Sequence, residues 1–235
     1  MNLEDRYAVH HKLLEIGVQG QRKLKEARVA IVGLGGLGSN VALGLASLGI
    51  GHITLIDDDH ISASNLSRQV LYHEADIQTP KVIAAVSHLK SRNAEVHYIP
   101  HQQRLTSSNA NTLLSNQDII IDGTDNIAGR IAIDAYCSSH NIPFIYGGIK
   151  GFMGHISVFN YKDGKSFKET FNHTEKLIAE ENCNDSGVIY PVVSMVANLQ
   201  VMQAFNILLE KQPILQGTLQ VVDLKNLTFK QFKLF

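Results

Sequence analysis

Tryptophan is absent from the 235 residues, only two residues are cysteine and five are proline, and the charges nearly cancel. A chain of this length buries roughly 70–75% of its unfolded surface, so it needs neither a disulfide nor a metal to fold. With so few thiols, a reducing, cytoplasmic location is expected. The 21 Lys and Arg residues do not exceed the 22 Asp and Glu residues. The basic excess of general nucleic-acid-binding proteins is therefore missing, which disfavours that class.

Long uninterrupted apolar runs are also missing. Residues 1–30 mix charges with apolar residues at helical spacing and contain no apolar core of signal-peptide length. The most apolar stretches, 27–51 and 188–209, are interrupted by glycine or polar residues. Such stretches are typical of buried elements in a globular domain, so we expect no membrane span.

Strand and helix patterns alternate along most of the chain. Two N-terminal helices are predicted within residues 1–27, one ending near Gly17 and one over 21–27. Apolar strand patterns follow at 28–32, 52–56, 95–99, 118–121 and 144–146, and helices at 37–48, 80–90, 107–114 and 126–140 separate them. This βαβ alternation predicts an α/β fold with a Rossmann-like, mostly parallel sheet and helices on both faces across residues 28–150.

The last third of the chain, residues 151–235, has a different pattern. Alternating residues at 155–161 and 216–234 predict antiparallel strands that continue the sheet, and a long helix is predicted over 192–209. The polar segment at about 162–187 fits neither period and is predicted to be a mobile loop. We interpret residues 1–235 as one domain in which this second half closes over the first.

The first apolar strand leads into a glycine-rich turn. Gly33, Gly35 and Gly38 form a Gly-x-Gly-x-x-Gly motif between that strand and a helix. Such glycines let backbone N–H groups approach a phosphate, and the helix N-terminus adds partial positive charge. The next strand is followed by Asp57, 19 residues after Gly38, where a carboxylate accepts hydrogen bonds from ribose hydroxyls. The alternative, that the glycines only form a tight turn, leaves Asp57 unexplained, so nucleotide binding is predicted.

Residues that follow the later strands indicate which nucleotide chemistry this is. The segment Ser64-Asn65-Leu66-Ser67-Arg68-Gln69 comes after Asp57, Lys81 begins a helix, and Gly123-Thr124-Asp125-Asn126 follows the strand at 118–121. Loops after parallel strands lie on one edge of the sheet, so Asp57, Arg68 and Asp125 can converge. Two cations and a carboxylate suit attack on an α-phosphate, with Mg²⁺ on the triphosphate. An NAD-dependent oxidoreductase, the remaining alternative for this fold, needs neither.

These motifs together resemble those of the ThiF/MoeB/HesA family of adenylating enzymes, bacterial relatives of the ubiquitin-activating enzymes. The resemblance covers nearly the whole chain. It implies ATP and Mg²⁺ as cofactors, with Arg68, Lys81 and Asp125 in catalysis and Asp125 serving Mg²⁺. The nucleotide-binding residues that it implies are Gly33, Gly35, Gly36, Gly38, Asp57, Asp59, Ser64, Asn65, Arg68, Gln69, Lys81, Asp125 and Asn126. Asp59 has a second interpretation, as a support of its loop. Asp122 is ambiguous beside Asp125, because a strand end exposes alternate side chains to opposite faces and only one of the two is expected to reach the site.

The resemblance also implies a reaction and partners. The C-terminal glycine carboxylate of a small ubiquitin-fold sulfur carrier, ending in Gly-Gly, attacks the ATP α-phosphate and gives an acyl adenylate for thiamine or molybdopterin biosynthesis. Residues 151–235 would bind the carrier, and a homodimer is expected. Two alternatives stay open. One is adenylation of another carboxylate, such as a peptide C-terminus, or of a modified tRNA base, and the other is a module that binds nucleotide and carrier without turnover.

The chain departs from the family pattern at three places. Val9 stands where members commonly carry an arginine that reaches the partner subunit's nucleotide, which motivates the binding-module alternative. Candidate substitutes are protonated His10, His11 or Lys12, or Arg6 after a small shift of the helix. The paired Cys-x-x-Cys motifs that hold zinc in many relatives are missing, so no zinc site is expected. Cys183, in the polar segment, is a candidate nucleophile toward the carrier, with an idle thiol as the alternative. Cys137, within a predicted helix, is expected to be a core residue.

Overall fold

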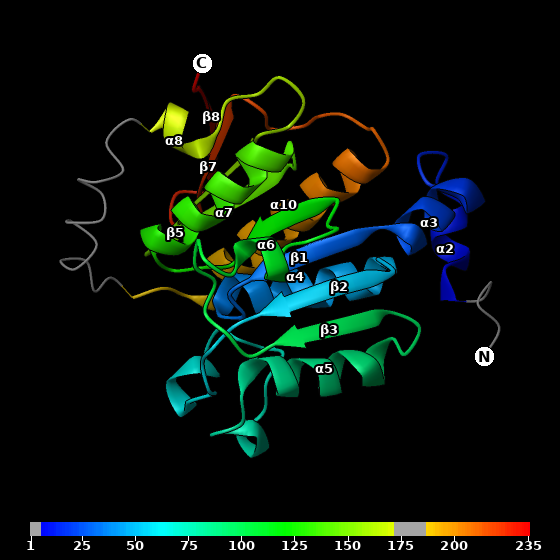
Figure 1. Cartoon of the computed structure of the whole chain (residues 1–235), viewed down its shortest axis with the longest axis vertical. Helices are drawn as coiled ribbons and strands as arrows, with labels where there is room; N and C mark the ends of the chain where they lie inside the picture. The colour runs from blue at the N-terminus through cyan, green and yellow to red at the C-terminus, as the bar shows by residue number, and fades with distance from the viewer. Residues whose placement is uncertain (1–5, 172–186) are drawn as a thin grey trace.

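The computed structural model describes residues 6–171 and 187–235. Within these residues the strands form one eight-stranded sheet in the order β3-β2-β1-β4-β5-β6-β7-β8. The strands are β1 (Arg28–Val32), β2 (His52–Ile56), β3 (His97–His101), β4 (Ile119–Asp122), β5 (Phe144–Lys150), β6 (Met153–Phe159), β7 (Thr218–Asp223) and β8 (Thr228–Lys233). Strands β1 to β5 are parallel, and the pairs from β5 to β8 are antiparallel. The predicted fold class is confirmed (Figure 1).

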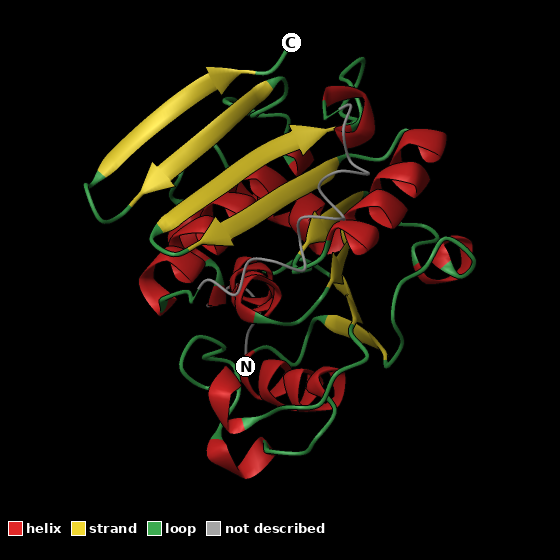
Figure 2. Ribbon diagram, turned by 90° about the vertical axis from the view of Figure 1, so that its left-hand side faces the viewer, coloured by secondary structure: helices red, strands yellow, loops and turns green. Residues whose placement is uncertain are grey.

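Helices cover both faces of the sheet because successive strand residues enter two different cores. The helices are α2 (Ala8–His11), α3 (Gly17–Glu26), α4 (Gly36–Leu48), α5 (Lys81–Arg92), α6 (Ala110–Leu113), α7 (Ile127–His140), α8 (Phe167–Thr170) and α10 (Tyr190–Leu208), with 3-10 turns η1 (Ala63–Asn65) and η2 (Glu74–Asp76). Val29 and Ile31 of β1 join the core that also contains residues of α4, α5 and α10. Ala30 and Val32 join the core that contains residues of α6 and α7. The two layers are visible from two directions (Figure 1, Figure 2).

Helix α10 is the main helix over the middle of the sheet. It packs against α4, β5 and β6, and its residues Val192, Val196 and Ala204 are fully buried. Among the described residues it is the one helix long and apolar enough to cross a membrane, yet 61% of its apolar window is buried inside the molecule. Such burial is typical of the core helix of a folded domain.

Two predicted helices differ from the structure. Gly17, with a φ of +54°, begins α3 instead of ending an earlier helix. Residues just before it form turns, and Leu14 is 98% exposed, so the apolar residues there do not form a buried helical face. The helix predicted at 107–114 shrinks to α6, because the Asn109 side chain accepts a hydrogen bond from the Thr106 N–H at 2.8 Å and stabilises a turn instead.

The polar segment at about 162–187, predicted to have no regular structure, contains the short helix α8 in its first part. Ser166 caps α8 by accepting from the Glu169 N–H at 3.1 Å. Phe167 is 3% exposed, and its ring packs 5.5 Å from the Phe159 ring and 4.9 Å from the Phe171 ring, measured between centroids. The polar composition of the segment gave no indication that Phe167 is buried. The rest of the segment, including Cys183, lies outside the described residues.

Candidate functional site

A cavity of about 920 Å³ opens at the carboxyl ends of β1, β2 and β4. These ends lie opposite the end of the sheet that carries α2 and α3 (Figure 1). The predicted site residues that line the cavity are Gly33, Gly35, Gly36, Asp57, Asp59, Asn65, Arg68, Gln69, Lys81, Asp125 and Asn126. Gly38 and Ser64 do not line it. Side chains from loops after three parallel strands therefore meet in one place, as their shared edge requires.

The glycines of the turn after β1 are required for different reasons. Gly33 has a φ of +86°, and a Cβ there would lie 2.6 Å from the carbonyl oxygen of Gly123. A Cβ at Gly38 would lie 1.8 Å from the carbonyl oxygen of Gly33, so Gly38 allows α4 to pack against the strand end. At Gly35 a Cβ would meet only the Gln69 side chain, at 3.8 Å. Packing thus explains Gly33 and Gly38, and it leaves Gly35 for another purpose.

The N-terminus of α4 borders the cavity without a cap. Gly35 precedes the helix with no side-chain hydrogen bond, and Gly36 and Leu37 line the cavity. The first N–H groups of a helix have no intrahelical partner and carry partial positive charge. By contrast, α7 is capped, since Asn126 Oδ1 accepts from the Gly129 N–H at 2.8 Å. The uncapped end of α4 is therefore the one of these two that suits a phosphate group.

Asp57 and Lys81 form a buried charged centre in this cavity. Lys81 Nζ lies 3.9 Å from Asp57 Oδ1 and donates to Asp59 Oδ2 at 2.8 Å. Asp57 also accepts from the backbone N–H groups of Leu34 and Asp59. Burial raises the pKa of Asp57 above its usual value, against the opposing effect of the Lys81 charge and these hydrogen bonds. Asp59 thus holds the Lys81 ammonium in place, which favours the interpretation of Asp59 as a structural support.

The segment after β2 brings a half-buried arginine to the cavity. Arg68 Nη1 donates to the Ser64 carbonyl oxygen at 3.1 Å, so Ser64 acts through its backbone. Asn65 Oδ1 accepts from the Ser62 N–H at 3.1 Å and fixes the turn that precedes Arg68. Gln69 is 2% exposed, and its Oε1 has no hydrogen-bond partner in the described part of the chain. A buried amide oxygen without a donor is costly, and a bound nucleotide would supply one.

The end of β4 carries two aspartates with different surroundings. Asp122 is fully buried, and its Oδ2 accepts from Arg130 Nε at 2.9 Å. Asp125 is exposed, and the hydrogen bond that the described residues give it comes from Asn126 Nδ2 at 3.3 Å. Asp125 is therefore a candidate carboxylate for a cation, and its hard oxygen atoms would suit Mg²⁺. Arg130 was not predicted as a site residue. Its position one helical turn after Asn126 places it on the same helix face, and this was the sequence signal for it.

One group of acidic side chains in residues 6–171 and 187–235 has metal-binding geometry. Ligand atoms of Asp57, Asp58 and Asp59 lie within 4.8 Å of one another. However, Asp59 pairs with Lys81, and Asp58 Oδ2 lies 3.2 Å from Arg104 Nε. Protein cations already neutralise this group, so Asp125 is the better candidate for a metal that enters with a nucleotide.

The N-terminal residues lie away from the cavity of their own chain. Arg6 Nη1 donates to the carbonyl oxygen of Arg92, the last residue of α5, at 3.0 Å. Val9 is 66% exposed, and neither Arg6 nor Val9 lines the cavity. Arg6 therefore does not replace the missing arginine within one chain. Cys137 is fully buried, as predicted, and burial raises the pKa of its thiol.

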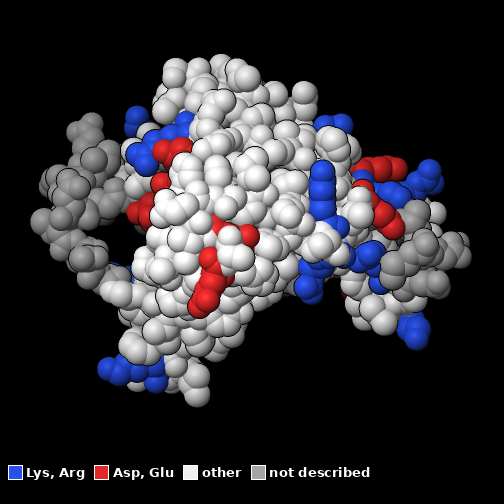
Figure 3. Space-filling view, turned by 90° about the horizontal axis from the view of Figure 1, so that it is seen from below, with Lys and Arg blue, Asp and Glu red and all other residues white. Residues whose placement is uncertain are grey.

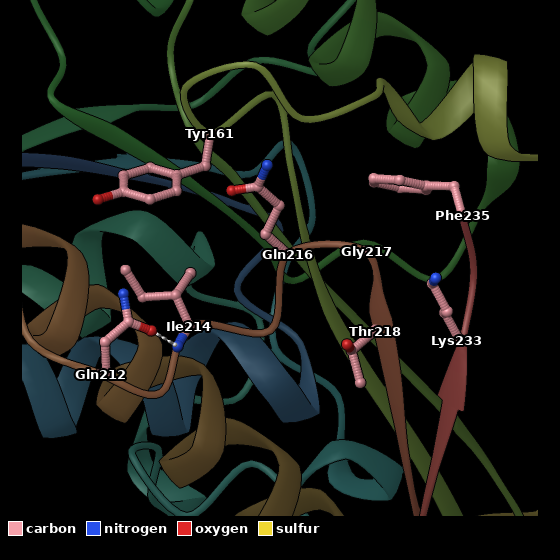
Figure 4. Close-up of a pocket in the computed structure, with 8 residues that line it drawn as sticks. All are labelled: Tyr161, Gln212, Ile214, Gln216, Gly217, Thr218, Lys233 and Phe235. Atoms are coloured by element: carbon pink, nitrogen blue, oxygen red, sulfur yellow. Dashed lines mark hydrogen bonds between the residues drawn. The ribbon is translucent and has the colours of Figure 1, made fainter.

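A second, smaller cavity of about 470 Å³ lies beside the ends of β7 and β8 (Figure 4). Its lining residues are Tyr161, Gln212, Ile214, Gln216, Gly217, Thr218, Lys233 and Phe235. Among the described residues that line it, Lys233 is the one charged side chain and none is a predicted site residue. It therefore lacks the combination of cations and carboxylates that phosphate chemistry requires.

Charged side chains are spread thinly over the lower face of the molecule. Figure 3 shows basic and acidic groups interspersed there, with most of the visible surface uncharged. A continuous basic stripe, which contact with a nucleic-acid backbone would require, does not appear on the described part of this face.

A family model and several curated proteins match nearly the whole chain. The sequence model of the ThiF family matches residues 7–235. The chain is 36% identical over 229 residues to the Adenylyltransferase and sulfurtransferase MOCS3 of Culex quinquefasciatus, an alignment that covers 97% of this chain and 52% of that protein. It is 34% identical over 217 residues to the molybdopterin-synthase adenylyltransferase of Escherichia coli, with 92% and 86% covered. The chain thus spans about half the length of the insect relative.

Other relatives and solved structures extend the likeness. The SAMP-activating enzyme E1 of Haloferax volcanii is 31% identical over 226 residues, covering 96% of this chain and 83% of that protein. The structure of E. coli MccB with ATP has a TM-score of 0.85 at 24% identity, covering 98% of this chain and 71% of that chain. PaaA has a TM-score of 0.83 at 25% identity, covering 99% and 73%. The solved structures show the shared fold.

Proposed function

Because the chain belongs to the ThiF family, we propose that it is an ATP-dependent adenylyltransferase that activates a carboxylate. The observation that carries the proposal is the convergence of Arg68, Lys81 and Asp125 on one cavity beside the uncapped N-terminus of α4. The names of its relatives, which describe adenylyltransferases and an activating enzyme, support the same reaction class.

The surroundings of each residue indicate which part of ATP it would bind. The free N–H groups around Gly35 and Gly36 suit phosphate oxygens. Asp57, at the end of the second parallel strand, suits the ribose hydroxyls. The buried Gln69 amide would complete its hydrogen bonds on a bound nucleotide. Asp125 would hold Mg²⁺, which neutralises charge on the triphosphate.

The reaction needs stabilisation of charge more than proton transfer. A carboxylate oxygen of the substrate attacks the α-phosphorus and forms the new P–O bond. The bond from that phosphorus to the bridging oxygen breaks, and pyrophosphate leaves with the electron pair. Charge on the phosphoryl oxygens is met by Arg68 and Lys81, and a buried ammonium such as Lys81 is especially effective because little water screens it.

We infer that the substrate carboxylate is the C-terminus of a small ubiquitin-fold sulfur carrier. The molybdopterin pathway is favoured by the E. coli relative, and a thiamine carrier is the alternative within the same class. The cavity extends along Tyr146, Gly148, Lys150 and His155, which gives an extended chain terminus a wall to follow. A homodimer, dependence on Mg²⁺ and a cytoplasmic location belong to the same proposal.

A second candidate function is a module that binds nucleotide and carrier without turnover. The observation that favours it is the N-terminus, where Val9 replaces the family arginine and Arg6 is bonded to Arg92. A transition-state arginine is worth several powers of ten in rate in phosphoryl transfer, so its loss would leave binding intact and slow the chemistry.

ATP–pyrophosphate exchange in the presence of a Gly-Gly carrier distinguishes these functions. The wild-type chain should catalyse carrier-dependent exchange, and Arg68→Ala and Asp125→Ala should each reduce the rate by about 10²–10³-fold. Arg22→Ala is the matched control, because Arg22 is exposed and forms an ion pair with Glu26 across one helical turn of α3. ATP binding without exchange for any carrier would favour the binding module. Tight NAD binding that ATP does not compete with would contradict both functions.

A further inference from the structure

Asp122 has both carboxylate oxygens engaged within the protein. Its Oδ1 accepts from the N–H and the hydroxyl of Thr124 at 2.8 and 2.6 Å, and its Oδ2 accepts from Arg130 Nε at 2.9 Å. Its backbone carbonyl accepts from Gln200 Nε2 of α10 at 2.7 Å. The last residue of β4 is thus tied to the following loop, to α7 and to α10. The backbone that leads to Asp125 is fixed at its start.

Arg130 joins two walls of the cavity. Its Nη2 donates to the carbonyl oxygens of Thr124 and Gly147, at 3.1 and 3.4 Å. Its guanidinium carbon lies 5.3 Å from the centroid of the Tyr146 ring. Thr124 immediately precedes Asp125, whereas Tyr146 and Gly147 belong to β5. One guanidinium, with only 13% of the side chain exposed, therefore connects the loop after β4 with strand β5.

Asp125 has little support of its own by comparison. Its side chain is exposed, and among the described residues it accepts a long hydrogen bond from Asn126 Nδ2 at 3.3 Å, while the Asn126 oxygen caps α7. The position of the Asp125 carboxylate is therefore determined mainly by the backbone of residues 123–126. Asp122 holds that backbone by accepting from the Thr124 N–H, and Arg130 holds it by donating to the Thr124 carbonyl oxygen.

We propose that Asp122 and Arg130 are positioning residues for Asp125, and that Arg130 fixes the distance between Asp125 and the β5 wall. A buried ion pair contributes little net stability over an apolar pair of the same volume, so stability alone is a weak explanation for this one. Orientation of a carboxylate that must meet a metal and a triphosphate is a stronger one. The role of Asp125 rests on the proposed function, whereas the positioning itself concerns the free protein.

Arg130→Lys tests the positioning directly. Lysine retains the charge and loses the planar fork, so it cannot serve Asp122, Thr124 and Gly147 together. In the ligand-free protein, we expect faster hydrogen–deuterium exchange at residues 123–126 and unchanged exchange in β1 and β2. Arg22→Lys, an exposed arginine in a helical ion pair, is the control and should change neither region. Unchanged exchange at 123–126 would overturn the proposal, as would a uniform increase across the sheet.

A second readout uses the coupling to Asp125. Arg130→Lys should reduce kcat of pyrophosphate exchange by about 10²-fold, the effect expected from a misplacement of about 1 Å. It should also raise the Mg²⁺ concentration needed for half-maximal rate, and it should add little further loss in an Asp125→Asn background. If the rate losses of Arg130→Lys and Asp125→Asn multiply fully in the double variant and the Mg²⁺ requirement is unchanged, Arg130 acts independently of Asp125. That result would contradict the proposal.

Thr124→Val guards against a failure of the arginine variant to fold. It replaces the hydroxyl, which donates to Asp122 Oδ1 at 2.6 Å and more weakly to the Asn126 carbonyl oxygen at 3.4 Å. It should change exchange at 123–126 and the Mg²⁺ requirement in the same direction, by a smaller factor. Absence of pyrophosphate exchange in the wild-type chain would contradict the proposed function. In that case the hydrogen–deuterium comparison alone would still decide the positioning proposal.

Discussion

The centre of the sheet and its C-terminal edge differ in burial and in what they contribute. All four residues of β4 are buried, as are four of the five residues of β1, whereas all six residues of β8 are exposed. Helices cover the centre on both faces, and its strand ends line the larger cavity. No described residue of β7 or β8 lines that cavity. The difference shows that burial on both faces is what fixes strand ends firmly enough to place a set of charged groups.

Alanine at two glycines should give the largest contrast between these regions. Gly38→Ala places a methyl group 1.8 Å from the Gly33 carbonyl oxygen at the centre of the sheet, and should cost more than about 4 kcal/mol of unfolding free energy. Gly151→Ala, in the β5–β6 hairpin, meets no atom within 4 Å and only strains a φ of +59°, at about 1 kcal/mol. Urea denaturation measures both. Equal losses would show that the turn after β1 relaxes freely.

Phenylalanine-to-alanine substitutions locate the boundary between the two regions. Phe159, on β6, is fully buried, with ring centroids 5.9 Å from Phe144 and 5.5 Å from Phe167. Its removal leaves a cavity and should cost about 3–5 kcal/mol. Phe232, on β8, is 51% exposed, and its removal should cost about 0.5 kcal/mol or less. A large effect at Phe232 would mean that the edge hairpin is part of the cooperative core.

The same difference explains how far the sequence predicted the fold. The central strands read as continuous apolar runs because both faces are buried, and β1 and β2 were predicted with their observed bounds. The C-terminal hairpin was predicted from alternation in its sequence, although the structure leaves all six residues of β8 exposed. Two secondary-structure predictions failed because of individual side chains. Asn109 stabilises a turn where the pattern predicted a helix, and Phe167 is a buried aromatic residue inside a polar segment.

The candidate site was predictable where sequence order alone decides position. The convergence of Asp57, Arg68 and Asp125 follows from the rule that loops after parallel strands share an edge. Gly38 was expected at the nucleotide, and the structure instead gives it a packing role against Gly33. Asp122 and Asp125 could not be separated, because the choice depends on the tertiary contact with Arg130. Contacts of that kind require knowledge of which side chains face the same buried space.

The smallest expected effect concerns His155, on the first strand beyond the parallel centre. Burial lowers its pKa below the usual value, and the nearby Arg130 charge adds to this. A histidine whose pKa is lowered in the folded state binds fewer protons than the unfolded chain does. Its contribution to stability is therefore complete above about pH 6.5 and is lost as the pH falls through the lower, folded-state value.

His155→Gln should remove part of this acid-side loss. Denaturation midpoints measured between pH 7 and 5 should fall less steeply in the variant than in the wild-type chain. His52, at the amino end of β2, also has a lowered pKa because of burial and the Arg28 charge, so His52→Gln should flatten the same window independently. Asp76 does not interfere: burial alone would raise its pKa, but the hydrogen bonds and charges of His73 and His88 together outweigh this and lower it, so its loss of stability falls below about pH 4. If the midpoints of His155→Gln fall with pH as steeply as those of the wild-type chain, water reaches His155 on β6. The boundary of the centre of the sheet would then lie between β5 and β6.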